Sequence, residues 1–169
     1  MVVLLAFALG CATAGNQRRA ADSRQSLAGW EVLVEHGRSD EAERLFDKRL
    51  RAEPADPVAL FGRAGIAYER GASEQAIAGY AAVLAALHAR PDDWGQLLAP
   101  VAAGRLLTLY DEVGVATRRR IVSSLHPAEL ARAAELPWQA RVELARLAAH
   151  AAREASDAAE LARVAERVG

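Results

Sequence analysis

The first half of the sequence repeats itself with a period of 34 residues. Residues 35–46 align with residues 69–80 at a constant offset, and the matched positions include a glycine, a serine, an alanine and an aromatic residue. The matched pairs are Glu35 with Glu69, Gly37 with Gly71, Ser39 with Ser73, Ala42 with Ala76 and Phe46 with Tyr80. A period of this length indicates one supersecondary unit that is used more than once, with neighbouring units burying each other's apolar faces. We therefore expect an array of such units.

The composition favours helices within these units. Alanine accounts for 40 of the 169 residues and arginine for 20, whereas aromatic residues make up only 5%. Alanine, leucine, arginine and glutamate are strong helix formers, and the β-branched residues that favour strands are sparse. The chain is therefore expected to be all-α, and the composition excludes an all-β fold. The net charge of −1 gives no general attraction to nucleic acid or to an anionic membrane.

The second copy of the repeat shows how the sequence builds a pair of helices. Asp56 can cap a helix that begins at Pro57, because proline lacks an N–H that would have no partner in the first helical turn. Gly71 has the backbone freedom to end this helix, and Ser73 is expected to cap the next one. Apolar residues recur at helical spacing in both helices. They are Leu60, Phe61, Ala64, Ala67 and Tyr68 in the first, and Ala76, Ile77, Tyr80, Val83, Leu84 and Leu87 in the second.

With these marks, the region resembles the tetratricopeptide repeat, a helix–turn–helix unit of 34 residues. The marks are a glycine between the helices, a small residue early in the second helix, an aromatic four residues later, and Pro54 near the end of the first unit. The second unit, about residues 57–90, is the cleaner copy, because it has Ala64 where the first unit has Trp30. The resemblance covers residues 25–90. It implies antiparallel helix pairs that stack into a right-handed superhelical solenoid.

Residues 91–169 are expected to form further helical hairpins, either degenerate repeats or capping helices. Asp92 or Asp93 can cap a helix that begins near Trp94, and Pro100 is expected to kink that helix or to reset its start. Thr117 is expected to cap a short helix that ends at Leu125, and another opens at His126 and Pro127.

The last part of the chain is expected to form a final helix pair at about residues 138–168. The first helix of this pair runs from Trp138 to Glu154, and Ser156 is expected to cap the second. The pair lacks the signature residues of the repeat. Solenoids often end in atypical capping units, so this absence is compatible with a repeat array.

The N-terminal segment carries a different signal, centred on the single cysteine, Cys11. Residues 2–9 form an apolar run that is too short to span a bilayer and has the length of the apolar region in a secretory signal peptide. The run ends in Gly10 and Cys11, and a polar stretch follows, so the segment resembles the signal of a bacterial lipoprotein. The resemblance implies that residues 1–10 are removed, that Cys11 carries a lipid, and that residues 11–24 form a flexible tether.

Two positions depart from the usual lipoprotein pattern. No lysine or arginine follows Met1, and Ala8 stands where leucine is usual, three residues before the cysteine. A start codon assigned too far downstream would account for the missing basic residues. Because alanine stands directly after the cysteine, at Ala12, the lipoprotein resemblance implies sorting to the outer membrane, at its periplasmic face. Two other interpretations stay open: a small buried cysteine beside an apolar N-terminal helix, and a cytosolic repeat protein whose start is incorrectly assigned.

The sequence contains none of the common catalytic or metal-binding motifs. The histidines are not at metal-ligand spacing from a cysteine, another histidine or a carboxylate, so we expect them to be structural. They are His36, His88, His126 and His150. Adjacent carboxylates at 92–93 and 111–112 do not face each other on a helix, as acid–base catalysis across a cleft requires. We therefore expect no enzymatic activity, no metal, no cofactor and no small-molecule substrate.

The tetratricopeptide resemblance implies a protein-binding groove lined mainly by the first helix of each unit. The positions that it assigns are Glu31, Val34 and Glu35 in the first unit, and Phe61, Gly65, Tyr68 and Glu69 in the second. Such a groove would be aromatic and acidic, which suits a peptide with apolar anchors and basic flanks. The alternative is that later helices bury Phe61 and Tyr68 as part of the core.

The densest run of charge is Arg118, Arg119 and Arg120. A cluster of this kind can contact phosphates, lipid headgroups or an acidic partner. No aromatic residues alternate with it, as they would on a face that binds single-stranded nucleic acid. Asp111 and Glu112 are close in sequence, so we expect the cluster to be solvated or paired locally. A site for an acidic partner is the alternative.

The anchor and the repeats together predict a lipid-anchored scaffold of the bacterial cell envelope that binds a protein or peptide partner. In architecture it is similar to lipoproteins that assist the assembly of outer-membrane complexes, an analogy at the level of fold. We expect no binding of nucleic acid, and membrane contact only through the lipid. The alternative is the helical N-terminal part of a larger envelope enzyme, hydrolase or transglutaminase-like, whose catalytic domain lies outside this chain.

Overall fold

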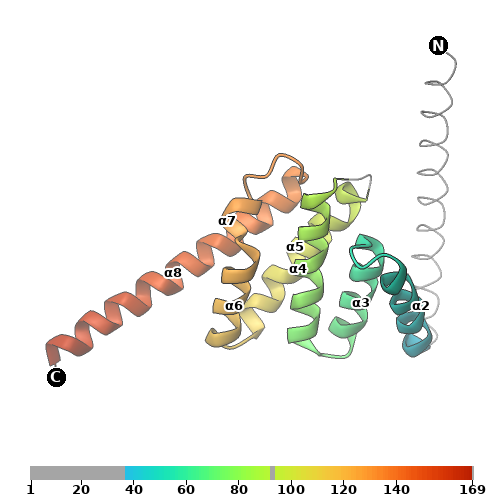
Figure 1. The fold of residues 1–169 in the computed structure, drawn as a ribbon. Helices are drawn as coiled ribbons and strands as arrows, with labels where there is room; N and C mark the ends of the chain where they lie inside the picture. Colours follow the sequence, from blue (N-terminus) through green and yellow to red (C-terminus); the bar gives the residue numbers. More distant parts are fainter. Residues whose placement is uncertain (1–36, 92–93, 169) are drawn as a thin grey trace, which may run out of the picture. The chain divides into compact units, whose positions relative to one another are not determined.

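The computed structural model describes residues 37–91 and 94–168, which form seven helices and no strand (Figure 1). The helices are α2 (Ser39–Ala52), α3 (Pro57–Glu69), α4 (Ser73–Ala89), α5 (Gly95–Glu112), α6 (Val115–Leu125), α7 (Pro127–Leu130) and α8 (Trp138–Val168). The all-α class predicted from the composition is therefore confirmed. The chain divides into two compact units, Met1–Leu45 and Phe46–Gly169.

In the first unit, the structure describes a turn and the start of α2. Gly37 has a φ of 70°, in the left-handed region that glycine adopts without strain. The Arg38 guanidinium pairs with the carboxylate of Glu41. Ala42, the small residue of the predicted repeat, is buried. The predicted signal peptide, Cys11 and the tether lie outside the described residues.

The start and the end of α3 form as the sequence predicts. The Asp56 carboxylate caps the helix, and its Oδ1 accepts hydrogen bonds from the backbone N–H groups of Val58 at 3.0 Å and Ala59 at 3.2 Å. Pro57 is the first helical residue. Gly71, with a φ of 69°, follows the helix in the left-handed conformation that ends many helices.

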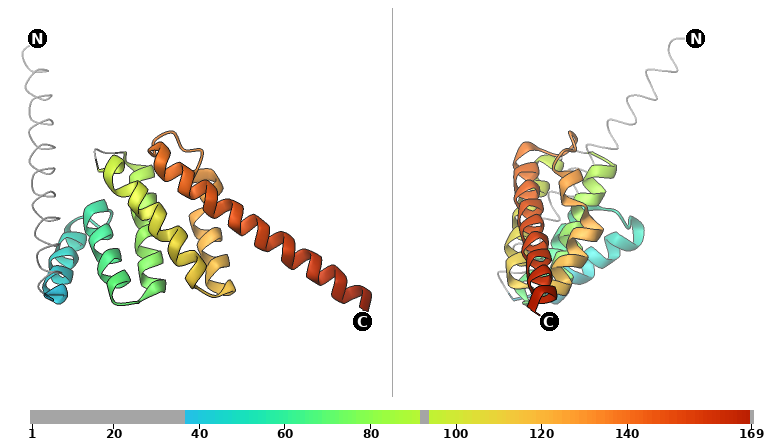
Figure 2. Two further views of the ribbon diagram at one scale, coloured as in Figure 1. Left: turned by 180° about the vertical axis from the view of Figure 1, so that it is seen from behind. Right: turned by 90° about the vertical axis from the view of Figure 1, so that its left-hand side faces the viewer.

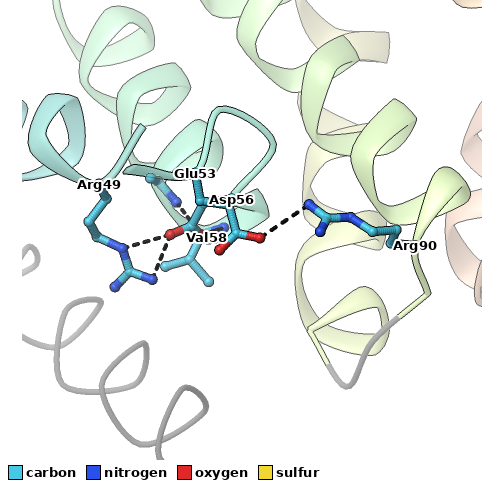
Figure 3. Close-up of polar contacts among 6 residues, drawn as sticks. Arg49, Glu53, Asp56, Val58 and Arg90 are labelled. Carbon is cyan, nitrogen blue, oxygen red and sulfur yellow. Dashed lines mark hydrogen bonds and ion pairs between the residues drawn. The ribbon is translucent and has the colours of Figure 1, made fainter. Parts of the chain in front are cut away.

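Asp56 also ties the end of α2 to the start of α3 (Figure 3). It is the one buried charged residue in the described part of the chain, and its Oδ2 lies 2.7 Å from both Nε and Nη2 of Arg49. Nearby, Nη2 of Arg90 donates to Oε1 of Glu53 at 3.2 Å. The turn between α2 and α3 is thus joined to the end of α4.

Helix α4 buries the predicted apolar stripe but lacks the predicted cap. The six stripe residues are all buried: Ala76, Ile77, Tyr80, Val83, Leu84 and Leu87. Ser73 is already the first helical residue, and Ala72 occupies the capping position with no side-chain hydrogen bond. The prediction that Ser73 caps the helix is therefore wrong by one position.

Small residues allow the helices of the larger unit to approach closely. A Cβ added to Gly79 would lie 2.7 Å from the Cβ of Ala64, so α3 and α4 meet at two small residues. A Cβ added to Gly62 would lie 2.2 Å from the ring of Phe46. Phe46 is buried, and its ring occupies the space that a side chain on α3 would need.

Two predicted features of α5 and α6 differ from the structure. Helix α5 begins at Gly95 and continues through Pro100, so the proline does not reset its start. Asp92 and Asp93 lie outside the described residues, and Trp94 precedes the helix. Helix α6 begins at Val115, not at Thr117, whose hydroxyl instead donates to Oε1 of Glu74 at 2.9 Å.

Residues 138–168 form the single helix α8 of 31 residues, so the predicted final helix pair is wrong. Ser156 lies inside this helix and does not begin a new one. The sequence around it consists mainly of alanine, glutamate, arginine and leucine, whose helix propensity outweighs the one serine. Before α8, His126 has a φ of 48° and separates α6 from α7.

Within the larger unit, the helices pack mainly on helices that are near in sequence. Helix α3 contacts α4, α4 contacts α5, and α5 and α7 contact α8. Contacts also join α3 to α5, α4 to α6, and α6 to α8. Helices α5 and α8 begin at the same end of this unit and run in the same general direction (Figure 2, left). No helix in the described ranges is both long and apolar enough to cross a membrane.

Candidate functional site

The predicted binding residues of the second repeat lie on α3, where α4 and α5 partly cover them. Phe61 is half-buried, and its ring meets that of Tyr80 edge to face, with centroids 5.7 Å apart and an interplanar angle of 67°. Gly65 is buried. Tyr68 is half-buried beneath Arg105 of α5, whose Cζ lies 4.4 Å from the ring centroid. The side chains of Phe61 and Tyr68 therefore contribute both to packing and to the surface.

Of the remaining predicted groove residues, the structure describes only Glu69. Glu69, at the end of α3, is exposed. Glu31, Val34 and Glu35, predicted from the first repeat, lie outside the described residues. The face that the structure describes is therefore formed by the second repeat and by the helix that follows it.

Two opposite charges, Arg105 and Glu69, lie close to the aromatic residues of this face. Burial raises the pKa of Tyr80, the positive charge of Arg105 lowers it, and Tyr68 and Glu69 raise it further. Arg105 and Glu69 thus both act on the same phenol. The face is not simply acidic, as the sequence predicted, because α5 brings an arginine onto it.

Helix α5 adds exposed apolar side chains beside this arginine. Leu97 is 60% exposed and Val101 is 46% exposed, whereas Leu98, Leu106 and Leu109 are buried. The sequence pattern did not distinguish Leu97, Val101 and Arg105 as surface residues, although a spacing of four places them on one side of the helix. We call Tyr68, Leu97, Val101 and Arg105 the α3–α5 face.

Arg118, the first residue of the basic cluster, is half-buried at the corner between α5 and α6. Its Nε donates to the carbonyl oxygen of Val113 at 2.8 Å, and its Nη2 donates to that of Asp111 at 2.9 Å. These carbonyls end α5 and have no partner within the helix. Nη1 of Arg118 also pairs with the carboxylate of Glu154 on α8.

Tyr110 completes this cluster beneath the arginine. Its hydroxyl donates to Oε2 of Glu154 at 3.0 Å, and Cζ of Arg118 lies 5.3 Å from its ring centroid. Burial and the hydrogen bond to Glu154 raise the pKa of Tyr110 to about 12. The phenol is therefore protonated at neutral pH and acts as a hydrogen-bond donor.

The rest of the basic cluster is on the surface. Nη2 of Arg120 lies 3.0 Å from Oε1 of Glu74, and Arg119 is exposed. Local pairing is present, but the acidic partners are Glu154 and Glu74 and not the carboxylates of Asp111 and Glu112. The reason is tertiary: α6 lies near the start of α4 and the middle of α8, which bring more distant carboxylates to the arginines.

Two of the described histidines, His88 and His150, each lie beside one carboxylate. Nδ1 of His88 lies 3.7 Å from Glu135, and Nδ1 of His150 lies 3.6 Å from Asp111. His36 lies outside the described residues. Within residues 37–91 and 94–168, no three histidine, cysteine or acidic side chains are grouped so that they could hold a metal ion.

Comparisons with family models, with curated proteins and with solved structures found no match. The described residues define a class, an all-helical protein with seven packed helices. The residues of the α3–α5 face and of the Arg118 cluster are therefore the basis for arguing function.

Proposed function

We propose that this chain is a cell-envelope scaffold with tetratricopeptide-like repeats that binds a protein partner. We further propose that a lipid on Cys11 holds it at the periplasmic face of the outer membrane. The 34-residue period supports the repeat, and so do the small residues that meet between α3 and α4. The N-terminal sequence resemblance supports the anchor.

The pattern of helix contacts supports a solenoid. In such an array each helix packs on its neighbours in sequence, and the corresponding helices of adjacent units also touch. The larger unit has both kinds of contact, because α4 touches α3 and α5, and because α3 touches α5 while α4 touches α6. In this arrangement α3 and α5 are the first helices of successive units, and their free sides would line the groove.

One observation carries the binding proposal: large apolar side chains are exposed next to an arginine–aromatic pair on the α3–α5 face. Leu97 and Val101 leave apolar surface in water, while Arg105 and Tyr68 are already held together. Aromatic residues and arginine are enriched at protein interfaces, and contiguous exposed apolar surface marks such sites. A protein segment with apolar anchors fits this face.

Site-specific photo-crosslinking in the native host tests this proposal. A photoreactive phenylalanine analogue at Val101 should give one discrete crosslinked product, and adding Leu97→Asp should abolish it. Val115 on α6, which is 57% exposed, is the matched control position for the same analogue. The same products from both positions, or no product from Val101, would contradict the proposed binding face.

The anchor needs a separate experiment. Metabolic labelling with a radioactive fatty acid should mark the full chain, and Cys11→Ala should remove both the label and the association with outer membranes. Persistent membrane association of the unlabelled variant would refute the lipid anchor. That result would leave the binding proposal standing, because the crosslinking at Val101 does not depend on it.

A further inference from the structure

Helix α8 has apolar residues on two opposite faces, and only one of them is packed. Ala140, Leu144 and Leu147 are buried, and they hold the helix against the rest of the larger unit. On the other side, Trp138, Val142, Ala145 and Ala149 are exposed, the first two at 63% and 40%. We call these four residues the outer α8 face.

The outer α8 face has the spacing of a coiled-coil seam. Its residues follow one another at intervals of four, three and four, which is the alternation of a and d positions in a heptad repeat. Two large residues are followed by two alanines, so side chains of a facing helix would find space opposite Ala145 and Ala149. A helix is therefore the shape that this face accommodates.

The positions that flank the seam are basic. In the same heptads, Arg141 occupies a g position, and Arg146 and Arg153 occupy e positions, where charges select the partner of a coiled coil. The two acidic residues of this stretch are already engaged: Glu143 pairs with Arg146, and Glu154 pairs with Arg118. Around the outer α8 face, positive charge is therefore in excess.

Arg141 shows the imbalance most directly. Its Nε is the one buried side-chain nitrogen or oxygen in the described part of the chain that lacks a hydrogen-bond partner. No described carboxylate pairs with this guanidinium, so a carboxylate brought by a partner would be stabilising at this position. Arg153 likewise forms no ion pair with any described residue.

We propose that the outer α8 face binds an acidic amphipathic helix of a partner protein. The partner's large apolar residues would pack between Trp138 and Ala149, and its glutamates or aspartates would face Arg141 and Arg153. A second copy of this chain fits poorly, because parallel pairing would place Arg141 against Arg146 of the other copy. Two alanines in the seam also give little apolar area for insertion into a membrane.

This binding surface is already ordered before a partner arrives. The packed face of α8 fixes the helix, and the hydrogen bond from Tyr110 to Glu154 and the ion pair from Arg118 to Glu154 hold its middle. A preorganised helix loses little conformational entropy on association. The proposal concerns a different surface from the α3–α5 face and does not depend on it.

The test uses the full chain and two synthetic peptides of three heptads. Both have leucine at a and d, and one has glutamate at e and g while the other has lysine there. By fluorescence anisotropy, the glutamate peptide should bind about tenfold more tightly than the lysine peptide, and added salt should reduce the difference. The combined substitution Arg141→Gln and Arg153→Gln should remove most of this preference.

The second part of the experiment places a charge in the seam. Ala149→Glu should weaken binding of the glutamate peptide by about tenfold or more, because the new carboxylate faces the partner's apolar and acidic residues. Ala116→Glu, at an exposed alanine of α6, is the matched control and should bind like the parent. Circular dichroism of both variants checks that the helices are intact.

Each contrary result identifies a different occupant. Equal binding of the two peptides, or equal binding by Ala149→Glu and Ala116→Glu, would overturn the proposal. A different result is that the chain binds vesicles that contain phosphatidylglycerol and shows no preference between the peptides. If Ala149→Glu abolished this vesicle binding and Ala116→Glu did not, the face would be assigned to a membrane. A dimer in analytical ultracentrifugation that Ala149→Glu dissociates would assign it to a second copy. None of these outcomes affects the crosslinking at Val101.

Discussion

At the scale of single residues, the close packing of the larger unit depends on positions that have no side chain. Gly62 and Gly79 are both helical, where glycine is usually unfavourable, and neither has a positive φ. Their role is spatial: Phe46 occupies the space beside Gly62, and Ala64 lies against Gly79. Ala42, Ala64 and Ala76, the small residues of the predicted repeat, are all buried, so the alanine-rich composition reflects helix packing as well as helix propensity.

Gly62→Ala should therefore destabilise the protein despite the better helix propensity of alanine. The added Cβ would lie 2.2 Å from the ring of Phe46, which is buried and must move. Overpacking of this kind costs about 1–3 kcal/mol of unfolding free energy. Urea unfolding followed by circular dichroism measures the difference.

Gly104→Ala provides the matched control within α5. A Cβ at Gly104 meets nothing within 4 Å, so the substitution should stabilise the protein by about 0.5–1 kcal/mol through helix propensity alone. If the two substitutions shifted the unfolding midpoint in the same direction, close packing around Gly62 could not be the reason for its glycine.

At the scale of helices, the Arg118 cluster joins three elements through one partly buried set of polar groups. Arg118 of α6 donates hydrogen bonds to carbonyl oxygens at the end of α5 and forms an ion pair with Glu154 of α8. The Glu154 carboxylate also accepts a hydrogen bond from the hydroxyl of Tyr110. Each member of this set has partners from another helix. The cluster thus fixes α8 beside α5 at a point where apolar packing gives way to exposed residues.

The raised pKa of Tyr110 predicts a loss of stability at high pH. The unfolded chain releases the phenolic proton near pH 10, whereas the folded protein holds it up to about 12. This contribution to stability is fully present below pH 10 and is lost as the pH rises from 10 through about 12. Tyr110→Phe should remove this pH-dependent contribution. Between pH 10 and about 12, the unfolding free energy of the parent should therefore fall more steeply than that of the variant, and the two slopes should differ by about 1.4 kcal/mol per pH unit.

Urea unfolding of the parent and of Tyr110→Phe between pH 8 and pH 12 measures this effect. At neutral pH the variant should be less stable by about 1 kcal/mol, because Glu154 loses one hydrogen bond. The raised pKa of Tyr80 affects both proteins equally and cancels in the comparison. Parallel pH profiles for the two proteins would show that Tyr110 is not the titrating group.

At the scale of the whole molecule, the contacts of the larger unit are mostly between helices that are near in sequence. Helix α8 contacts α5, α6 and α7, whereas α3 contacts α4 and α5. In the linear array that we propose, stability would be approximately a sum of local interfaces. Damage at one end is then expected to spread only partly to the other.

Leu147→Ala tests whether the unit behaves as a linear array. Leu147 is fully buried on the packed face of α8, so its truncation should cost about 2–5 kcal/mol. Native-state hydrogen exchange should show larger losses of protection in α5 and α8 than in α3. Leu84→Ala in α4 is the matched control and should reduce protection more in α3 and α4 than in α8. Uniform loss of protection from both substitutions would argue against a solenoid.

Local sequence patterns were sufficient to predict the all-α class, the cap at Asp56, the turn at Gly71 and the buried stripe of α4. These features depend on interactions within a few residues, which helical spacing and capping residues express directly. Ser73 and Thr117 show the limit of such local signals. Both residues can cap a helix, but in the structure each lies just inside one.

The packing of the helices sets which residues reach the surface and which distant groups meet. Leu97 and Leu98 are adjacent residues of the same type, but the position of the neighbouring helices exposes the first and buries the second. The contact of Arg105 with Tyr68 and that of Arg118 with Glu154 join residues far apart in the chain. Their physical origin is the packing of whole helices, which a local pattern of residues does not encode.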